Sequence, residues 1–413
     1  MTDLTGTGLL VAAVIKVLTL FTLLLVLVAL ATYVERRVAG FIQDRSGPNR
    51  VGPIGLLQAV ADGLKSLLKE ETSPDEASKS LFFLAPALTI VPATVLFAVI
   101  PFGSPLPTRW GLVELIVADV PIGFLYILAL SSLGVYGLVL AGWASNSKYA
   151  FLGGLRGSAQ MISYEIGLAM SLIPVLLLAG NVRMPELVSM QQSFEGGPGT
   201  FGLWFVLPLL VAAFVFFVSS LAETNRLPFD LPEAEAELVA GYHTEYSSMK
   251  FSMFILGEYA HLITAGALVT VFFLGGWDIP GWTGDNIRVL ADGSVIGEPT
   301  WWKTVLTFTS FSLKTTLVVL VFMWIRWTLP RFRYDQLMDF GWKVFIPGLM
   351  AYISIIAIAI YVLESRGFEP GPAYAGILFA VNAALAGLVW FVLDRGVLVR
   401  GAASVPQAAK EME

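Results

Sequence analysis

The sequence predicts an all-α fold, a polytopic integral membrane helical bundle with about nine transmembrane helices and an amphipathic helix at the cytoplasmic face. Only 14% of the 413 residues are charged and 56% are hydrophobic, whereas about a quarter of a soluble domain is charged. The mean hydropathy is +0.76. The 28 Phe, 12 Tyr and 11 Trp residues exclude a disordered chain, and a net charge of −6 argues against a nucleic-acid binder.

The expected spans follow from length. A helix that crosses about 30 Å of hydrocarbon needs about 20 mostly apolar residues, because its backbone hydrogen bonds must close within the segment. Nine stretches satisfy this: 9–33, 81–102, 120–143, 158–180, 201–222, 251–276, 304–328, 341–363 and 374–393. The first is expected to be a retained anchor, because its apolar run is too long for a secretory signal. We expect residues 1–393 to form one transmembrane domain and residues 394–413 a short cytoplasmic tail.

The distribution of Lys and Arg predicts the orientation. Segments 34–80, 144–157, 223–250, 326–343 and 394–413 hold 18 of the 25 basic residues, and the opposite-side segments hold five. Because basic residues favour the cytoplasmic side, the N-terminus is expected outside and the C-terminus inside.

Residues 54–69 predict an amphipathic helix of about four turns between the first two spans. Apolar residues such as Leu57, Val60 and Leu64 recur at spacings of three and four. Two roles fit: an anchor in the headgroup plane, or the wall of a lipid-accessible chamber that Asp62 and Lys65 face.

The segment 223–250 has an unusual excess of acids, which are Glu223, Asp230, Glu233, Glu235, Glu237 and Glu245. Such loops are ordinarily solvated surface, but here apolar residues such as Phe229 and Leu231 alternate with the acids. This indicates a loop folded back on the bundle. Carboxylates that lie close together in low dielectric have raised pKa values, so the loop suits proton storage and relay.

Two further acids, Glu165 and Glu258, lie inside expected spans. Ionisable groups are costly in a membrane, so we expect these two to relay protons, with structural hydrogen bonding as the alternative. Lys16 and Lys314 also lie inside spans, where each can pair with a carboxylate or reach toward an interface.

The chain has no cysteine and only two histidines. Disulfides, thiolate nucleophiles and cysteine-held iron–sulfur clusters are therefore excluded, and the spacing of His243 and His261 predicts no metal site. Electrons that move near this chain must be carried by another one.

Four segments, at 35–65, 145–165, 222–246 and 324–338, resemble the quinone-site membrane component of bacterial respiratory complex I, the H subunit of NADH:quinone oxidoreductase. Glu35-Arg36-Arg37 opens the first segment, and Ala222-Glu223-Thr224-Asn225-Arg226 opens the third. The similarity covers roughly residues 10–365, so the last expected span and the tail lie beyond it.

The resemblance implies a quinone chamber at the junction with a hydrophilic arm, and a carboxylate path toward antiporter-like subunits. The residues that match chamber positions are Arg36, Arg45, Asp62, Arg226, Phe229, Arg326 and Arg331. Those that match the proton path are Glu165, Glu223, Glu233, Glu235, Glu237, Glu245 and Glu258.

The resemblance also implies the surroundings of the chain. Quinone, either ubiquinone or menaquinone, is the substrate, and iron–sulfur clusters and flavin lie in partner subunits only. The partners are the hydrophilic-arm subunits with the terminal iron–sulfur cluster, small membrane subunits, antiporter-like subunits and membrane lipids. The location is the bacterial cytoplasmic membrane.

Two alternatives stay open at this point. A transporter or channel would use the same carboxylates without redox chemistry, but it has no need of a basic and an acidic loop on one face. A related subunit of a membrane-bound hydrogenase or ferredoxin-linked complex is the other alternative. The acidic loop and the segment 326–338 favour the quinone enzyme.

Overall fold

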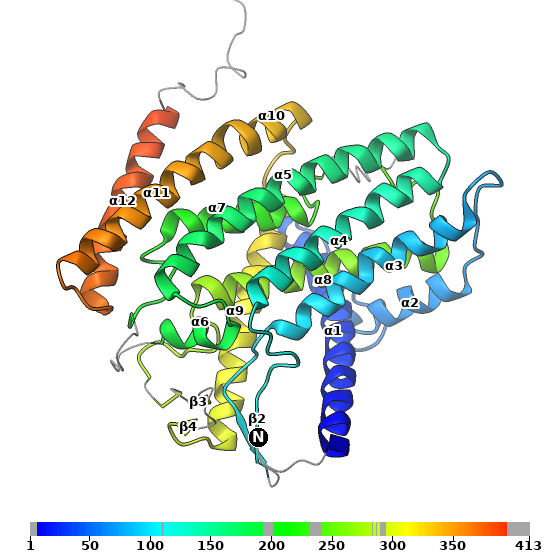
Figure 1. Ribbon diagram of the computed structural model, residues 1–413. Coiled ribbons are helices and arrows are strands. Elements are labelled where there is room, and N and C mark those ends of the chain that lie inside the picture. The colour runs from blue at the N-terminus through cyan, green and yellow to red at the C-terminus, as the bar shows by residue number, and fades with distance from the viewer. Residues whose placement is uncertain are drawn as a thin grey trace, which may run out of the picture.

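The computed structural model describes residues 6–108, 111–192, 201–230, 241–282, 284–285, 287–289 and 295–394, which are mostly helical (Figure 1). The helices in the first half are α1 (Gly6–Ile42), α2 (Gln58–Leu68), α3 (Lys79–Leu96), α4 (Gly123–Ala144), α5 (Lys148–Ala179) and α6 (Met184–Met190). Those in the second half are α7 (Leu210–Glu223), α8 (Ser248–Phe273), α9 (Trp301–Thr328), α10 (Tyr334–Asp339), α11 (Ile346–Ser365) and α12 (Pro372–Asp394).

Short irregular elements connect the helices. Two 3-10 turns cover Pro53–Gly55 and Phe97–Val99, and a π-helical turn at Phe340–Phe345 joins α10 to α11. Two antiparallel hairpins pair β1 (Leu106–Thr108) with β2 (Gly111–Val113), and β3 (Arg288–Val289) with β4 (Val295–Ile296).

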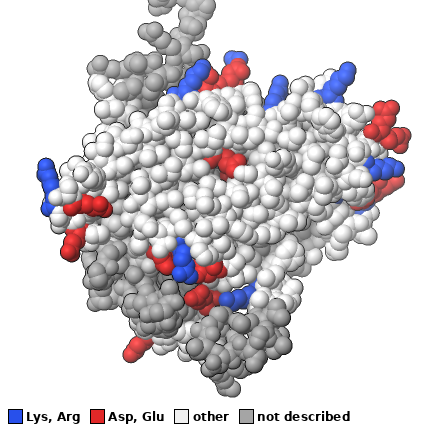
Figure 2. All heavy atoms as spheres, in the orientation of Figure 1, with Lys and Arg blue, Asp and Glu red and all other residues white. Residues whose placement is uncertain are grey.

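Eight helices in the described ranges are long and apolar enough to cross a membrane. They are Ala13–Ile42, Lys79–Val99, Gly123–Ala144, Lys148–Ala179, Ser248–Phe273, Trp301–Thr328, Tyr334–Ser365 and Pro372–Phe391. The expected all-α multi-pass bundle is therefore confirmed. Figure 2 agrees, because charged side chains gather mostly around the rim of the face shown and leave a broad uncharged expanse between them.

The span expected at 201–222 is shorter in the structure. Helix α7 begins at Leu210 and has 14 residues, which rise about 21 Å and fall short of the hydrocarbon thickness. Pro208 explains the late start, because inside a helix it would remove one backbone hydrogen bond and clash with the preceding turn. Its carbonyl instead accepts a hydrogen bond from Asn382 of α12 at 2.6 Å.

The amphipathic helix also begins later than expected. Helix α2 starts at Gln58, because Ile54 and Gly55 have φ values of 56° and 82° and cannot continue a right-handed helix. About three turns remain, and Leu64 and Leu68 on α2 are exposed. Ser248, at the start of α8, donates to the Ser66 carbonyl at 2.8 Å and so fastens α2 to the bundle.

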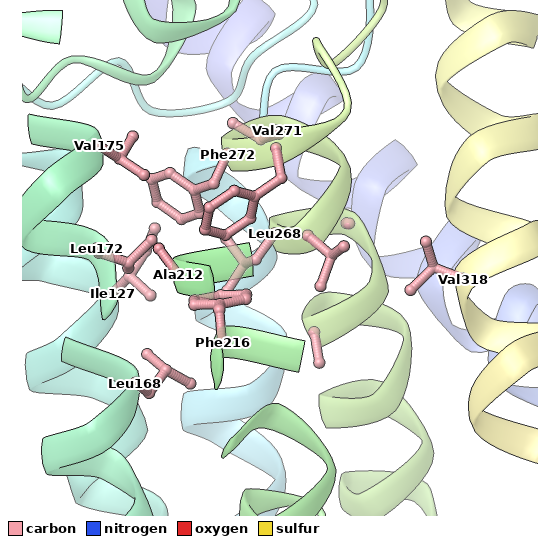
Figure 3. Close-up of a cluster of buried hydrophobic side chains, with 14 of the residues drawn as sticks. Ile127, Leu168, Leu172, Val175, Ala212, Phe216, Leu268, Val271, Phe272 and Val318 are labelled. Carbon is pink, nitrogen blue, oxygen red and sulfur yellow. The ribbon is translucent and has the colours of Figure 1, made fainter. Parts of the chain in front are cut away.

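The core lies where α4, α5, α7 and α8 meet, and Figure 3 shows Phe216 and Phe272 there among aliphatic side chains. The two rings lie 5.8 Å apart at 64°. Because lipid is as apolar as the side chains, close packing holds the helices together. A Cβ on Gly137 of α4 would lie 2.3 Å from the Thr89 hydroxyl, so only glycine permits this approach of α3 and α4.

The transmembrane domain expected at 1–393 stays a prediction; the last described helix, α12, ends at Asp394. Most of the tail expected at 394–413 lies outside the described residues. So do Glu233, Glu235 and Glu237, because residues 231–240 are not described.

Candidate functional site

A buried cluster of two arginines and two glutamates lies where α1, α8, α9 and the loop after α7 meet. The Arg226 side chain is 1% exposed and donates to Glu35 on α1 at 2.7 Å and to Glu258 on α8 at 2.6 Å. Arg326, near the end of α9, donates to the other oxygen of Glu35. We call Arg226, Glu35, Glu258 and Arg326 the arginine–glutamate cluster. Its formal charges balance, as buried charges require.

Local structure directs Arg226 into this cluster. Helix α7 ends at Glu223, and Asn225 adopts the left-handed conformation with φ 51°, which turns the chain inward. The guanidinium then stacks 4.3 Å from the centre of the Tyr259 ring. Burial alone would lower the pKa of Arg226, but Glu258 and Glu35 raise it above its ordinary value, so Arg226 stays charged.

One donor of this guanidinium differs from the others. Nη2 of Arg226 is buried and has no hydrogen-bond partner among the described residues. Leaving a buried donor unpaired costs about 1–3 kcal/mol, and more when it is charged. The arrangement therefore suits a ligand with an oxygen acceptor.

A second polar group joins α1 to α2 at the rim. Arg36 donates to Asp62 at 2.5 Å, and Gln58 and Lys65 donate to the same carboxylate at 3.2 and 3.3 Å. Burial alone would raise the pKa of Asp62, but the hydrogen bonds from Arg36 and Lys65 hold it below its ordinary value. Arg45 does not join this group and bonds the nearby Gln43 at 2.6 Å.

The loop after α7 is fastened on both sides. The Phe229 ring packs against Tyr164 of α5, with centroids 5.5 Å apart, and against Phe332 at 5.8 Å. Asp230 pairs with Arg331 at 3.4 Å. Burial raises the pKa of Asp230 to about 6, against the opposing effect of Arg331. This carboxyl group can therefore exchange protons near neutrality.

Two more acids meet deeper in the bundle. Glu165 on α5 accepts a hydrogen bond from Ser132 of α4. Glu223, at the end of α7, lies beside Ser131 and interacts electrostatically with Glu165. We call Glu165 and Glu223 the acid pair. A serine hydroxyl thus lies next to each carboxyl group of the acid pair.

An apolar cleft leads to the arginine–glutamate cluster. A cavity of about 400 Å³ runs between α1, α8 and α9, lined by five residues of α1 from Leu23 to Val34 and eight of α9 from Phe308 to Met323. The α1 side alone is about 16 Å long. Val34 precedes Glu35, and Met323 lies three residues before Arg326, so the inner end of the cleft adjoins the cluster.

The structure thus brings seven of the fourteen predicted site residues into three places, at the cluster, the Asp62 rim and the acid pair. Glu245 lies half-buried in the turn after residue 240 and makes no ion pair among the described residues. Glu233, Glu235 and Glu237 lie outside the described part of the chain.

Sequence reasoning misses Glu35 as a site residue, although it bridges both arginines. The sequence predicts that the first span ends at residue 33, which would leave Glu35 in a solvated, charged segment. The helix instead continues to Ile42, so Glu35 sits inside it and is 3% exposed. The apolar residues at 38–42, which follow Glu35-Arg36-Arg37, could have indicated that the helix continues past Glu35. Tyr259, Ser131 and Ser132 were missed because nothing in their spacing marks them.

Comparison with known proteins matches this chain to one family over most of its length. The family described as NADH dehydrogenase matches residues 15–357. One NADH-quinone oxidoreductase H subunit of Geobacter metallireducens is 48% identical over 341 residues, which cover 83% of this chain and 93% of that protein.

Two further relatives come from distant organisms. The NADH-quinone oxidoreductase H subunit of Magnetococcus marinus is 46% identical over 355 residues, covering 86% of this chain and 93% of the relative. NADH-ubiquinone oxidoreductase chain 1 of Chondrus crispus is 48% identical over 348 residues, covering 84% and 96%.

Proposed function

Since the chain belongs to the NADH dehydrogenase family, we propose that it is the H subunit, a membrane component, of a proton-translocating NADH:quinone oxidoreductase. In this role it forms part of the quinone chamber and a carboxylate-lined path that couples quinone reduction to proton translocation. It contributes to an oxidoreductase without a redox centre of its own.

One observation carries the proposal: an apolar cleft lies next to the cluster in which a buried arginine has a donor that no described residue accepts. The cleft is the kind of environment that an isoprenoid tail requires, and Nη2 of Arg226 is a donor for a quinone carbonyl. Arg36 and Asp62 line the rim through which a headgroup passes on its way from lipid. Arg326, Phe229 and Arg331 complete the neighbourhood, and Arg45 belongs to it by resemblance alone.

The chemistry explains why charges gather at the inner end of the cleft. Reduction adds two electrons to the quinone and makes its oxygens strongly basic, so two protons must follow. Arginine donors stabilise the negative charge as it develops. The electrons come from the terminal iron–sulfur cluster of a hydrophilic-arm subunit, since this chain has no cysteine.

The same charge change drives the proton path. Glu258 shares Arg226 with the substrate, so a negative quinone competes for the guanidinium, weakens the hold of Arg226 on Glu258 and frees that carboxylate for proton transfer. Glu223 and Glu165 continue the path through the bundle. The expected members Glu233, Glu235, Glu237 and Glu245 rest on the resemblance.

The multi-pass bundle then lies in a bacterial cytoplasmic membrane, with the N-terminus outside and the C-terminus inside. Hydrophilic-arm subunits cover the cytoplasmic face, and small membrane and antiporter-like subunits extend the proton path sideways. The excess of Lys and Arg in the segments on one side supports this orientation.

Filling the cleft tests the proposal. Ala31 of α1 lines the cleft, so Ala31→Phe should raise the KM for long-tailed quinones several-fold while leaving short-tailed analogues nearly unaffected. Ala351→Phe, at an exposed position of α11, is the matched control. Equal kinetics for both tail lengths in Ala31→Phe would show that the tail does not use this cleft.

A further inference from the structure

His261 occupies an unexplained position between the two acidic sites. It lies on α8, three residues and one helical turn beyond Glu258, on the way into the bundle. Its Nε2 is buried and has no hydrogen-bond partner among the described residues. Buried polar atoms in proteins are nearly always paired, so an unpaired ring nitrogen here requires an explanation.

The ring faces α4. A Cβ built on Gly134 would lie 3.4 Å from Nε2 of His261, which is ordinary van der Waals contact, and the atoms within 4 Å of it belong to this ring. Nε2 thus lies against the backbone of α4 at Gly134, and alanine would place a methyl group in contact with it.

Helix α4 links the contact between His261 and Gly134 to the acid pair. Ser131 lies one turn from Gly134 along α4 and is beside Glu223, and the next residue, Ser132, bonds Glu165. Helices α4 and α8 are antiparallel, because α5 and α7 lie between them in the chain and successive helices of the bundle reverse direction. One turn toward the C-terminal end of α8 and one turn toward the N-terminal end of α4 therefore lead in the same direction. Each covers about 5 Å, away from Arg226.

A separate observation supports a polar interior along this line. Ser219 of α7 lies one turn before Glu223, and its hydroxyl is also buried without a partner among the described residues. It stands 3.2 Å from the position of a Cβ on Gly167, two residues after Glu165. The backbone of α5 thus passes close to a second unpaired polar atom.

We propose that His261 carries protons between the arginine–glutamate cluster and the acid pair, at its contact with Gly134 of α4. The inference rests on the proposed function and adds a proton-carrying residue to its path. Imidazole suits the task, because one ring nitrogen accepts a proton while the other releases one, and no electrons are transferred. The acids on this route are Glu258, one turn before His261 on α8, and the acid pair, which Ser131 and Ser132 of α4 contact.

Gly134→Ala is the sharpest test, because it places a methyl group against Nε2 of His261 without a clash. Alanine favours a helix over glycine by about 1 kcal/mol, so the variant should fold and assemble. We expect proton pumping and quinone reduction in membranes to fall at least about tenfold. NADH oxidation by ferricyanide, which does not require the quinone site, should be unchanged. Gly348→Ala on α11, with no atom within 4 Å among the described residues, is the matched control.

Variants of the histidine separate proton transfer from space filling. His261→Asn and His261→Ala should both lose pumping, and added imidazole should restore His261→Ala. Pyrazole has the same ring size but is a far weaker base, so it should not restore activity. Equal restoration by the two rings would overturn the proposal, as would full pumping in His261→Asn or Gly134→Ala.

Glu165→Gln, measured in parallel, distinguishes a failure of the proposed function from a failure of the proposed role of His261. Loss of pumping in Glu165→Gln together with full pumping in Gly134→Ala and His261→Asn would leave the proposed function standing and refute the role of His261. Undiminished pumping in Glu165→Gln would instead count against the proposed proton path.

Discussion

Replacing Arg226 with lysine tests the unpaired guanidinium donor. Lysine keeps the positive charge that Glu35 and Glu258 require, so the cluster stays neutral and the chain should assemble. Lysine lacks the planar guanidinium group of arginine. Two of its nitrogens in Arg226 donate to Glu35 and Glu258, and no described residue accepts a hydrogen bond from the third, Nη2. The ammonium of Arg226→Lys also has three donors, but its compact tetrahedral geometry cannot bond both carboxylates and place the third donor where Nη2 lies.

The magnitude follows from the lost contact. A hydrogen bond to a charged donor contributes about 1.5–3 kcal/mol, and every 1.4 kcal/mol corresponds to a factor of ten. The kcat/KM for quinone in Arg226→Lys should therefore fall by about 10- to 150-fold. The assay is NADH-driven quinone reduction in membranes at several quinone concentrations, with ferricyanide reduction as the measure of intact electron input.

Arg333→Lys is the matched control, because the Arg333 side chain is 81% exposed and its ion pair with Asp335 is fully at the surface. It should leave kcat/KM unchanged. If Arg226→Lys also kept its full kcat/KM, the Nη2 donor would have no role in binding the substrate, and the proposed headgroup position would be wrong.

Three further outcomes can be measured on the same complex. Glu165→Gln should assemble and keep its bond to Ser132 but lose most proton pumping, measured with a pH-sensitive dye in inverted vesicles. Burial raises the pKa of Asp230 from 3.8 to about 6, so the folded state binds a proton that the unfolded state has lost, and stability falls as pH rises between these values. That interval corresponds to roughly 3 kcal/mol, so Asp230→Asn should unfold at a higher temperature than the parent above about pH 6 and at a similar one below about pH 4. Arg331→Ala should weaken docking of the hydrophilic arm or slow quinone turnover, and a fully assembled, fully active complex would make this arginine a mere surface charge.

The bundle could be predicted because a membrane imposes a simple requirement. Each span must be long and apolar, and eight of the nine expected stretches correspond to helices that satisfy it. The exception at 201–222 failed because average hydropathy ignores Pro208, which lies just before the first residue of α7 and disfavours an earlier start of that helix. Similarly, the helix expected at 54–69 lost its first turn to the positive φ values at Ile54 and Gly55.

The site was harder to predict, because its contacts join residues far apart in the chain. Glu35 and Arg226 are separated by 191 positions, and Glu35 and Arg326 by 291. Acids inside spans, such as Glu165 and Glu258, could be singled out because they are costly there. The partner that balances each charge depends on the tertiary fold, and hydropathy carries no information about it.

Helix α8 explains how the cleft and the proton path can stay separate and still be coupled. Ile263 lines the apolar cleft, whereas His261, two residues earlier and therefore about 200° around the helix, faces Gly134 of α4. The body of the helix thus keeps the hydrocarbon tail away from the polar interior. Glu258 lies on the same helix and is held by Arg226 at the inner end of the cleft. Under the proposed function, a charge that appears next to Arg226 consequently alters Glu258, the first carboxylate of the proposed proton path, without any need for protons to cross the apolar cleft.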